Sequence, residues 1–170
     1  MCMNRAYLVK KPRNNSGFSL IEVLITILIV SFGLLGMAAL ILSGARSNNI
    51  AHYRSIASKQ TEDIADRMRA NLAGVTAGAY NALTATIPAS NDCLTNICNA
   101  AQVAAYDHAQ WNTANSRLLP GGTGTVNGSV AVGFVITLMW TEKEMNGQAD
   151  PACPGGTPVN TRCFLTRSSP

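Results

Sequence analysis

The sequence has few charged residues and only two histidines. Asp, Glu, Lys and Arg make up 13% of its 170 residues, about half of the share that is usual in a soluble domain. Beyond residue 17 it lacks a basic excess, because nine basic side chains are matched by nine acidic ones. A neutral body offers no electrostatic footprint for a phosphate backbone. The composition therefore argues against a fully soluble globule and against a nucleic-acid partner.

Patterns of catalytic and cofactor-binding residues are also lacking. The segment Gly121–Gly124 resembles a phosphate loop, but no Gly-Lys-Ser/Thr follows it and the next element is expected to be a strand. Asp107 and His108 are neighbours on an expected helix and so point in different directions. We expect them on a solvated helix surface rather than in a catalytic dyad. The sequence predicts no enzyme activity and no cofactor.

One long apolar run dominates the N-terminal part. Residues 18–42 contain a single charged residue, Glu22. As a helix, this run would be roughly 37 Å long at about 1.5 Å per residue, which is enough to cross a membrane. The alternative is a secretory signal peptide cut near Ala45, but the core of such a peptide has only about 7–15 apolar residues. The basic residues ahead of the run are typical of a cytoplasmic anchor; they are Arg5, Lys10, Lys11 and Arg13.

Glu22 is the residue of this run that needs a functional explanation. A carboxylate within a membrane helix costs about 2.5–3.5 kcal/mol at the bilayer centre, and such residues are functional by default. Its surroundings read Gly17-Phe18-Ser19-Leu20-Ile21-Glu22. With the basic leader, this string resembles the signature of the type IV pilins and their pseudopilin relatives, which have Gly, an aromatic residue, an apolar stretch and Glu at the fifth position of the mature chain.

The resemblance implies specific roles for three residues. A prepilin peptidase would cut after Gly17 on the cytoplasmic side, and Phe18 would become an N-methylated terminus. Glu22 would neutralise the terminal amine of a neighbouring subunit in the assembled filament. A buried amine and a buried carboxylate each carry a desolvation cost that is offset only when they meet.

One feature departs from the family pattern. Many major pilins carry a proline midway along this helix, whereas residues 37–40 here read Met-Ala-Ala-Leu. Gly33 and Gly36 either supply local flexibility instead or simply allow close helix packing.

The helix is expected to continue to about residue 73. Apolar side chains recur with helical spacing at Ile50, Tyr53, Ala57, Ile64, Met68 and Leu72. Lys59, Asp63 and Arg67 follow one another at four-residue steps and predict a solvated face. Such a helix needs a second element to cover its apolar stripe.

The C-terminal part is expected to supply this cover. Residues 79–99 are predicted to be mostly loop, with a short helical turn near Tyr80. Residues 99–118 predict a helix with Asn99 as its N-cap. The buried side of that helix is expected to contain Val103, Ala104, Trp111, Ala114 and Leu118.

Residues 129–140 are the clearest strand, with Val130, Val132, Phe134, Ile136 and Leu138 alternating. Residues 124–127 and 162–166 are expected to pair beside it. The predicted fold is therefore α+β, with a long N-terminal helix packed on a small antiparallel sheet of three or four strands. The expected segments are a cleaved basic leader (1–17), a transmembrane or filament-core helix (18–42), an amphipathic continuation (43–74) and a pilin head (75–170).

The chain has five cysteines, one of which, Cys2, lies in the leader. The other four allow three pairings, and local loops favour Cys93–Cys98 and Cys153–Cys163. A zinc site is the alternative, but spacings of four and nine intervening residues fit common zinc ligand pairs poorly. We expect two disulfides and no metal.

The C-terminal half also resembles the PilV-type minor pilins, through Trp111, Leu119-Pro120-Gly121-Gly122 and Trp140 in that order. This resemblance implies a minor pilin that primes assembly or forms the tip complex of a type IV pilus. It would be a single-pass inner-membrane protein with a periplasmic head before it joins the pilus. Its partners would be other minor and major pilins, the prepilin peptidase/N-methyltransferase and the inner-membrane assembly platform.

Three alternatives remain open from the sequence. The first is a pseudopilin of a type II secretion system, which would share the same signature. The second is an adhesive or DNA-capturing tip protein, although residues 79–170 hold only four basic side chains against five acidic ones. The third is a membrane-tethered periplasmic enzyme, for which the sequence displays no convergent site.

Overall fold

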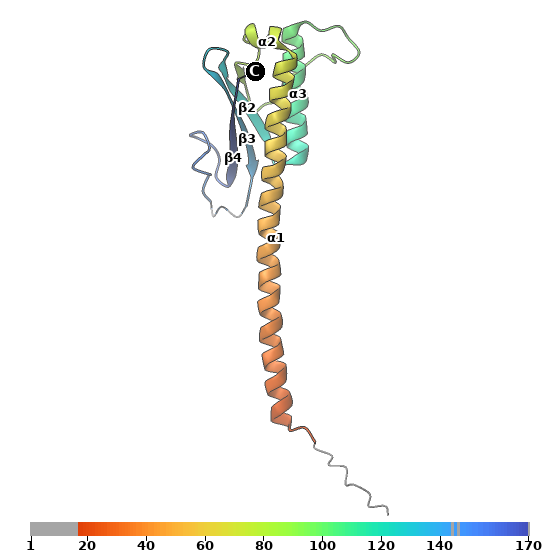
Figure 1. Ribbon diagram of the computed structural model, residues 1–170, viewed down its shortest axis with the longest axis vertical. Helices are drawn as coiled ribbons and strands as arrows, with labels where there is room; N and C mark the ends of the chain where they lie inside the picture. Colours follow the sequence, from red (N-terminus) through yellow and green to blue (C-terminus); the bar gives the residue numbers. More distant parts are fainter. Residues whose placement is uncertain (1–16, 144, 146, 170) are drawn as a thin grey trace, which may run out of the picture. The chain divides into compact units, whose positions relative to one another are not determined.

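The computed structural model describes residues 17–143, 145 and 147–169. Its helices are α1 (Leu20–Ala70), α2 (Leu72–Thr76) and α3 (Ala100–Leu118). Its strands are β1 (Ala82–Leu83), β2 (Thr123–Ser129), β3 (Gly133–Thr141) and β4 (Thr161–Ser168) (Figure 1). The chain divides into two units between Arg46 and Ser47, and the second unit is termed the head. The basic residues expected in the leader, and Cys2, lie outside the described residues.

In the first unit, α1 is exposed on all sides. Every residue from Gly17 to Asn49 is exposed, and the most apolar stretch of 18 residues has a mean hydropathy of 2.6 with none of it buried. The hydroxyls of Thr26 and Ser31 donate to carbonyl oxygens of the preceding helical turn, at 2.8 and 2.7 Å. Because the helix satisfies these polar groups itself, its surface suits a surrounding of lipid or of other apolar helices. By length and composition, α1 is the one helix of the described residues that qualifies to cross a membrane.

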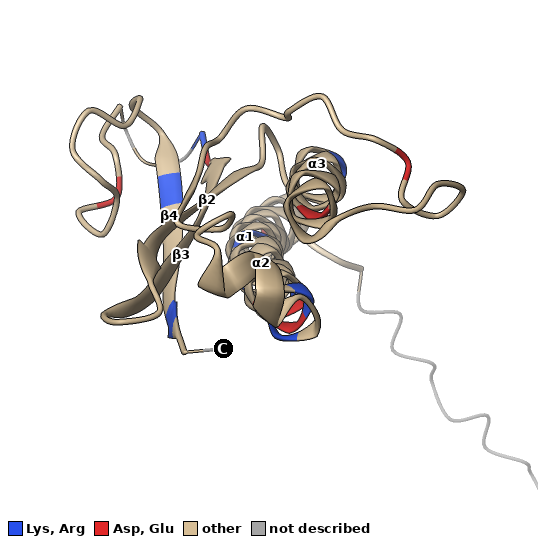
Figure 2. Ribbon diagram, turned by 90° about the horizontal axis from the view of Figure 1, so that it is seen from above, with Lys and Arg blue, Asp and Glu red and all other residues tan. Residues whose placement is uncertain are grey.

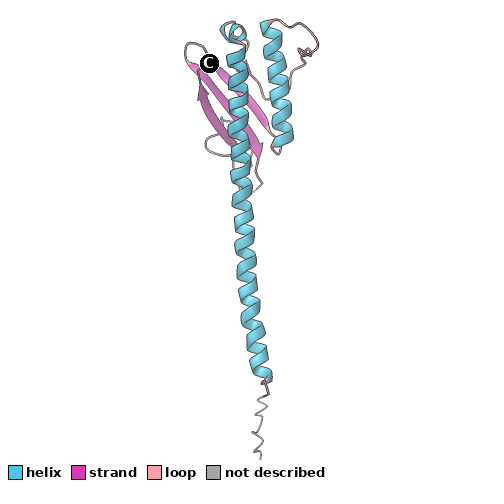
Figure 3. Cartoon of the chain, turned by 45° about the vertical axis from the view of Figure 1, so that its right-hand side comes forward, coloured by secondary structure: helices cyan, strands magenta, loops and turns pink. Residues whose placement is uncertain are grey.

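In the head, the last part of α1 and helix α3 lie side by side over one face of the sheet (Figures 1 and 3). The indole N–H of Trp111 donates to the carbonyl oxygen of Gln60 at 2.8 Å and joins the two helices. The largest fully buried side chains come from both helices, the turn after α2 and the sheet; they include Trp111, Trp140, Tyr80, Phe134, Ile64 and Met68. The head therefore has one shared core.

The sheet is antiparallel with the order β1-β2-β3-β4. Strand β3 is central, and its inward residues alternate as predicted, with Phe134, Ile136, Leu138 and Trp140 all buried. The α+β prediction of a long helix packed on a small antiparallel sheet is confirmed. The two-residue strand β1 was not foreseen in the expected loop, because a segment this short has no readable period.

The predicted start of the central strand is wrong by four residues. Val130 and Val132 lie in the turn between β2 and β3, where they are exposed. Ser129 pairs with Gly133, and Gly133 adopts a φ of +79°, a conformation that favours glycine. Val130 and Val132 continue the apolar alternation of the sequence, but strand β3 begins only at Gly133.

The long helix stops at Ala70, close to the predicted end. Asn71 leaves the helical conformation, and its side chain accepts a hydrogen bond from the Gly74 N–H at 3.1 Å, which starts α2. Because α2 begins anew, the buried stripe of α1 does not extend into it. Leu72 was expected on that stripe and is instead exposed.

Helix α3 begins as predicted, with a capping box between Asn99 and Gln102. Its buried side is a regular stripe with an unexpected composition: Ala104, Asp107, His108, Ala109, Trp111, Asn112 and Asn115. The prediction that Asp107 and His108 lie on a solvated surface is wrong, and Leu118, which was expected inside, is exposed. The buried side of α3 was predicted wrongly because four of its residues are polar, and hydrogen bonds allow these residues to be buried.

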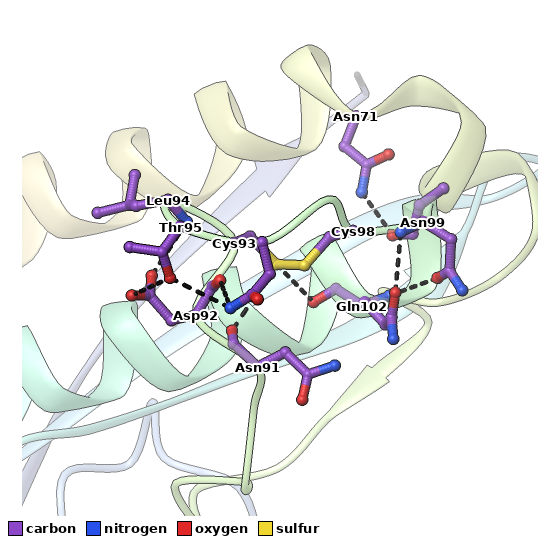
Figure 4. The surroundings of a disulfide bond; sticks show 11 residues. Asn71, Asn91, Asp92, Cys93, Leu94, Thr95, Cys98, Asn99 and Gln102 are labelled. Carbon is purple, nitrogen blue, oxygen red and sulfur yellow. Dashed lines mark hydrogen bonds between the residues drawn. A yellow bond between two sulfur atoms is a disulfide. The ribbon is translucent and has the colours of Figure 1, made fainter.

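Both local disulfides are present, Cys93–Cys98 and Cys153–Cys163. Figure 4 shows the first, in the loop before α3. The second ties the loop after β3 to strand β4, in which Cys163 is buried. Each disulfide closes its own loop, at sequence separations of 5 and 10 residues.

Removing the second disulfide is expected to destabilise the head more than removing the first. The loss of a native disulfide typically costs about 2–5 kcal/mol, and the stabilisation grows with the length of the closed loop. Cys163 also lies in an edge strand that the bridge holds in place. Steady-state levels of the double variants Cys153→Ser/Cys163→Ser and Cys93→Ser/Cys98→Ser test this, and equal accumulation would contradict it.

Candidate processing and assembly site

The predicted cleavage position lies just ahead of α1. Gly17, Phe18 and Ser19 have no regular secondary structure, and the helix begins at Leu20. The carbonyl oxygen of Ser19 accepts the first hydrogen bonds of the helix, including one from the Glu22 N–H at 3.0 Å. The Gly17–Phe18 peptide bond is therefore outside the helical hydrogen-bond ladder. Phe18 is exposed, so an enzyme has access to this bond without unwinding the helix.

Glu22 lies in the first turn of α1. A carboxylate at this position is stabilised by the unpaired N–H groups and the dipole of the helix N-terminus, typically by about 0.3–1 kcal/mol. Its neighbours Phe18, Val23 and Thr26 line a shallow hollow with it. This hollow contains the single carboxylate of the apolar run 18–42, and it is open to a partner.

The structure thus gathers Gly17, Phe18 and Glu22 in one short exposed stretch. The four head cysteines form two separate bridges and do not converge on a common site. One bridge lies near the start of α3, and the other lies at the start of β4.

The head contains a buried polar cluster that the sequence did not reveal. The Tyr80 hydroxyl donates to Asp107 Oδ2 at 2.5 Å, and Arg67 Nη1 lies 3.3 Å from Asp107 Oδ1. Arg67 also donates through Nε to Asp63 at 2.9 Å, and Asn71 Nδ2 donates to the Tyr80 hydroxyl at 3.1 Å. The cluster joins α1 and α3 to the turn after α2.

The charges and burial of this cluster change two pKa values. Burial, and then the hydrogen bond to Asp107, raise the pKa of the Tyr80 hydroxyl well above its ordinary value. Burial alone would lower the pKa of the Arg67 guanidinium, but the hydrogen bonds and negative charges of Asp63 and Asp107 outweigh it and raise the pKa. Both groups therefore keep their protons at physiological pH, and the cluster acts as a fixed clamp between the helices.

The contacts of Asp107 and His108 also decide whether they form a catalytic pair. Asp107 bonds to Arg67 and Tyr80, whereas His108 Nε2 lies 2.7 Å from the carbonyl oxygen of Thr84. Asn112 donates to the same carbonyl at 3.0 Å. The two neighbours make separate structural contacts, as expected from their different directions on the helix. The regular spacing of these polar residues along α3 was the one signal that could have indicated their burial.

A second ion cluster fixes the loop between β3 and β4. Arg162 donates through Nε to Glu142 at 2.8 Å and lies 3.2 Å from Asp150. The hydrogen bond to Glu142 is the main reason that the pKa of Arg162 lies above its ordinary value. Together with the Cys153–Cys163 bridge, these contacts hold the loop against the start of β4.

Comparison with known proteins found one family model that matches, the prokaryotic N-terminal methylation motif, over residues 12–38. The match covers the start of α1 with Gly17, Phe18 and Glu22. It supports a type IV pilin-like or pseudopilin-like chain, and it implies processing by a prepilin peptidase and assembly with other pilins. With the exposed apolar helix, it is consistent with membrane anchoring followed by incorporation into a pilus. No curated protein and no solved structure matches the chain.

Proposed function

We propose that this protein is a PilV-type minor pilin of a type IV pilus. The observation that carries the proposal is the start of α1. The Gly17–Phe18 bond, at which we propose cleavage, stands directly before α1, which is exposed on all sides as far as Asn49. Glu22, in the first turn, is the single charged residue of the apolar run 18–42. The match to the methylation motif over the same residues supports this interpretation.

In this proposal the chain is held in the bacterial inner membrane by residues 18–42 and carries its head in the periplasm. The basic residues of the leader favour a cytoplasmic N-terminus. The two disulfides of the head suit an oxidising compartment on the other side. A prepilin peptidase cuts after Gly17 and methylates Phe18, and the assembly platform then draws the subunit into a filament.

Glu22 guides this last step. The apolar helix leaves the lipid for a bundle of similar helices, where the Phe18 amine of one subunit must be buried. A carboxylate from a neighbouring subunit offsets the cost of burying that amine, and this favours one stagger of the helices over others. The subunit works with other minor pilins in a complex that primes assembly or sits at the tip.

A pseudopilin of a type II secretion system is the second candidate, because it would have the same N-terminal motif. Mass spectrometry of sheared surface pili distinguishes the two candidates. We expect the mature chain in the pili at low stoichiometry relative to the major subunit. Its absence from pili, with the mature chain retained in the membrane of a piliated strain, would favour the pseudopilin.

A further inference from the structure

Helices α1 and α3 run antiparallel through the head. The Asn71 side chain donates through Nδ2 to the Ala100 carbonyl at 2.8 Å, and the Trp111 indole donates to the Gln60 carbonyl at 2.8 Å. Between these two contacts α1 runs back by as many residues as α3 advances, so the helices stay side by side (Figures 1 and 3). Helix α3 therefore ends on the side of the head at which Ser47 lies, and we term this side the near end.

The loop after β3 lies at the near end as well. The Thr141 N–H donates to the Pro120 carbonyl at 2.8 Å, which holds the end of β3 against the segment after α3. The Glu142 N–H donates to the Asn160 carbonyl at 2.7 Å, so the loop both leaves and returns at this end. Five exposed residues of α1, α3 and this loop are termed the near-end surface: Arg54, Arg117, Leu118, Lys143 and Val159.

Basic residues predominate in the near half of the head, on the Ser47 side of the contact between Trp111 and Gln60. The described basic residues of this half are Arg54, Lys59, Arg117, Lys143 and Arg162, and its described acidic residues are Glu142 and Asp150. Glu144 belongs to the same loop in sequence but lies outside the described residues. In the other half the balance is reversed, with acidic residues in excess: Arg67, Arg69, Arg167, Glu62, Asp63, Asp66, Asp92 and Asp107.

The described acidic residues of the near half are paired within the head, whereas the cations of the near-end surface are not. Glu142 and Asp150 both contact Arg162, at 2.8 and 3.2 Å. Figure 2 shows acidic residues of the loop after β3 in red and basic residues of β4 in blue. In the part of the chain that the structure describes, the three basic residues of the near-end surface form no ion pair. They are exposed and available to an anionic partner.

Exposed apolar side chains accompany these cations. Leu118 is 46% exposed and directly follows Arg117, and Val159 is 62% exposed in the loop after β3. Basic side chains next to apolar ones suit the boundary of a lipid bilayer, where cations meet the headgroup phosphates and apolar groups meet the acyl chains.

The sequence ties the near end to the apolar run by a short link. Ser47 follows Leu42, the last residue of the run, by five positions. Even a fully extended link of this length spans only about 18 Å. If residues 18–42 cross a bilayer, this link limits how far the near end can lie from the lipid headgroups, whatever the direction of the head.

We propose that the near-end surface binds anionic phospholipid headgroups of the membrane that holds the chain. This inference rests on the membrane anchor of the proposed function. An anionic lipid surface favours binding by roughly fivefold for each Lys or Arg near it. Nucleic acids also offer phosphate groups, but the tether keeps the bilayer at a high effective concentration. The contact belongs to the membrane-held state, because a subunit leaves the lipid when it enters a filament.

Photocrosslinking of the full mature chain in lipid nanodiscs tests the contact. A photoreactive phenylalanine derivative replaces Val159, and Val132, which is 83% exposed in the turn between β2 and β3, serves as the control position. In bilayers that contain phosphatidylglycerol, we expect lipid adducts at Val159 and only background at Val132. In bilayers of phosphatidylcholine alone, the adducts at Val159 should fall several-fold. Equal adducts at both positions, adducts only to a second copy of the chain, or no lipid adducts at Val159 would overturn the proposal.

Charge variants with the same photoreactive group at Val159 provide a second test. Reversing two cations together, Arg117→Glu with Lys143→Glu, should lower the lipid adducts by roughly tenfold or more, because two attractions become repulsions. The control is Arg167→Glu, an exposed basic residue of β4 in the other half of the head, and it should leave the adducts unchanged. Equal losses in the two variants, or no loss in either, would overturn the role of the near-end cations.

Carbonate extraction of cell membranes distinguishes the failure of this proposal from that of the proposed function. If the chain stays in the membrane but forms no lipid adducts, only the lipid contact is wrong. If carbonate releases the chain, the membrane anchor is wrong and both proposals fail. If the lipid adducts form but the chain is absent from the sheared pili of a piliated strain, the pilus role fails and the lipid contact stands.

Discussion

Glu22→Gln is expected to remain in the membrane and to be lost from pili. Replacing the carboxylate removes the one charge of the apolar run, so membrane insertion becomes easier by at most a few kcal/mol. Cleavage after Gly17 is expected to persist, because Gly17 and the basic leader are unchanged. In the filament, however, the Phe18 amine of a neighbouring subunit loses its partner, and an unpaired buried charge costs about 3–5 kcal/mol. That cost corresponds to a loss of two orders of magnitude or more in incorporation.

The structure offers a matched control in the same helix. Ser31 is also polar and exposed, but its hydroxyl donates to the Ile27 carbonyl of its own helix at 2.7 Å and needs no partner. Ser31→Ala should therefore enter pili at the wild-type level. Membrane fractionation and immunoblots of sheared pili for both variants give the readout. Wild-type amounts of Glu22→Gln in pili would contradict charge neutralisation and leave Glu22 as a recognition element for the processing enzyme.

Asp107→Ala is expected to destabilise the head by about 3 kcal/mol. The substitution removes the carboxylate of a buried ion pair, and breaking such a pair typically costs about 3–5 kcal/mol. The expected loss of stability is at the low end of this range, because Arg67 is partly exposed and still pairs with Asp63. The buried Tyr80 hydroxyl also loses its acceptor. Asp107→Asn retains an acceptor of the same shape without the charge, and a smaller loss is expected.

Asp66→Ala is the control for this prediction. Asp66 pairs with Arg69 on the exposed side of α1, where its side chain is 74% exposed, and such surface pairs contribute about 0–1 kcal/mol. Both tryptophans of the chain lie in the head, so the fluorescence of the full chain in detergent reports the unfolding of the head. Equal free energies of unfolding for Asp107→Ala and Asp66→Ala would show that the cluster does not hold α3 in place.

The order of elements was predictable because it follows from strong local patterns. Three local signals were clear in the sequence: the apolar run 18–42, the N-cap at Asn99 and the alternation from Phe134 to Trp140. The buried side of α3 was not predictable in the same way. Hydrophobicity alone favours Leu118 over Asp107 as a buried residue of α3. Asp107 is buried because it has partners on α1 and in the turn after α2, and the sequence of α3 by itself does not reveal them.

The N-terminal site was recognisable because its residues are adjacent in sequence. Gly17, Phe18 and Glu22 lie within six positions, so no long-range contact is needed to bring them together. The exposed turn between β2 and β3 could not be found this way. In the sequence, Val130 and Val132 look like strand residues, and only the turn at Gly133 places them outside.

Analysis of the mature N-terminus by mass spectrometry tests the central proposal most directly. If the chain is a pilin-type subunit, its N-terminal peptide begins at Phe18 and carries a methyl group on the terminal amine, and the apolar helix remains attached. If α1 instead begins with an ordinary secretory signal, cleavage falls near Ala45 and the mature chain begins at Arg46. A mature chain that starts at Arg46 would contradict the pilin assignment and, with it, the roles given to Gly17, Phe18 and Glu22.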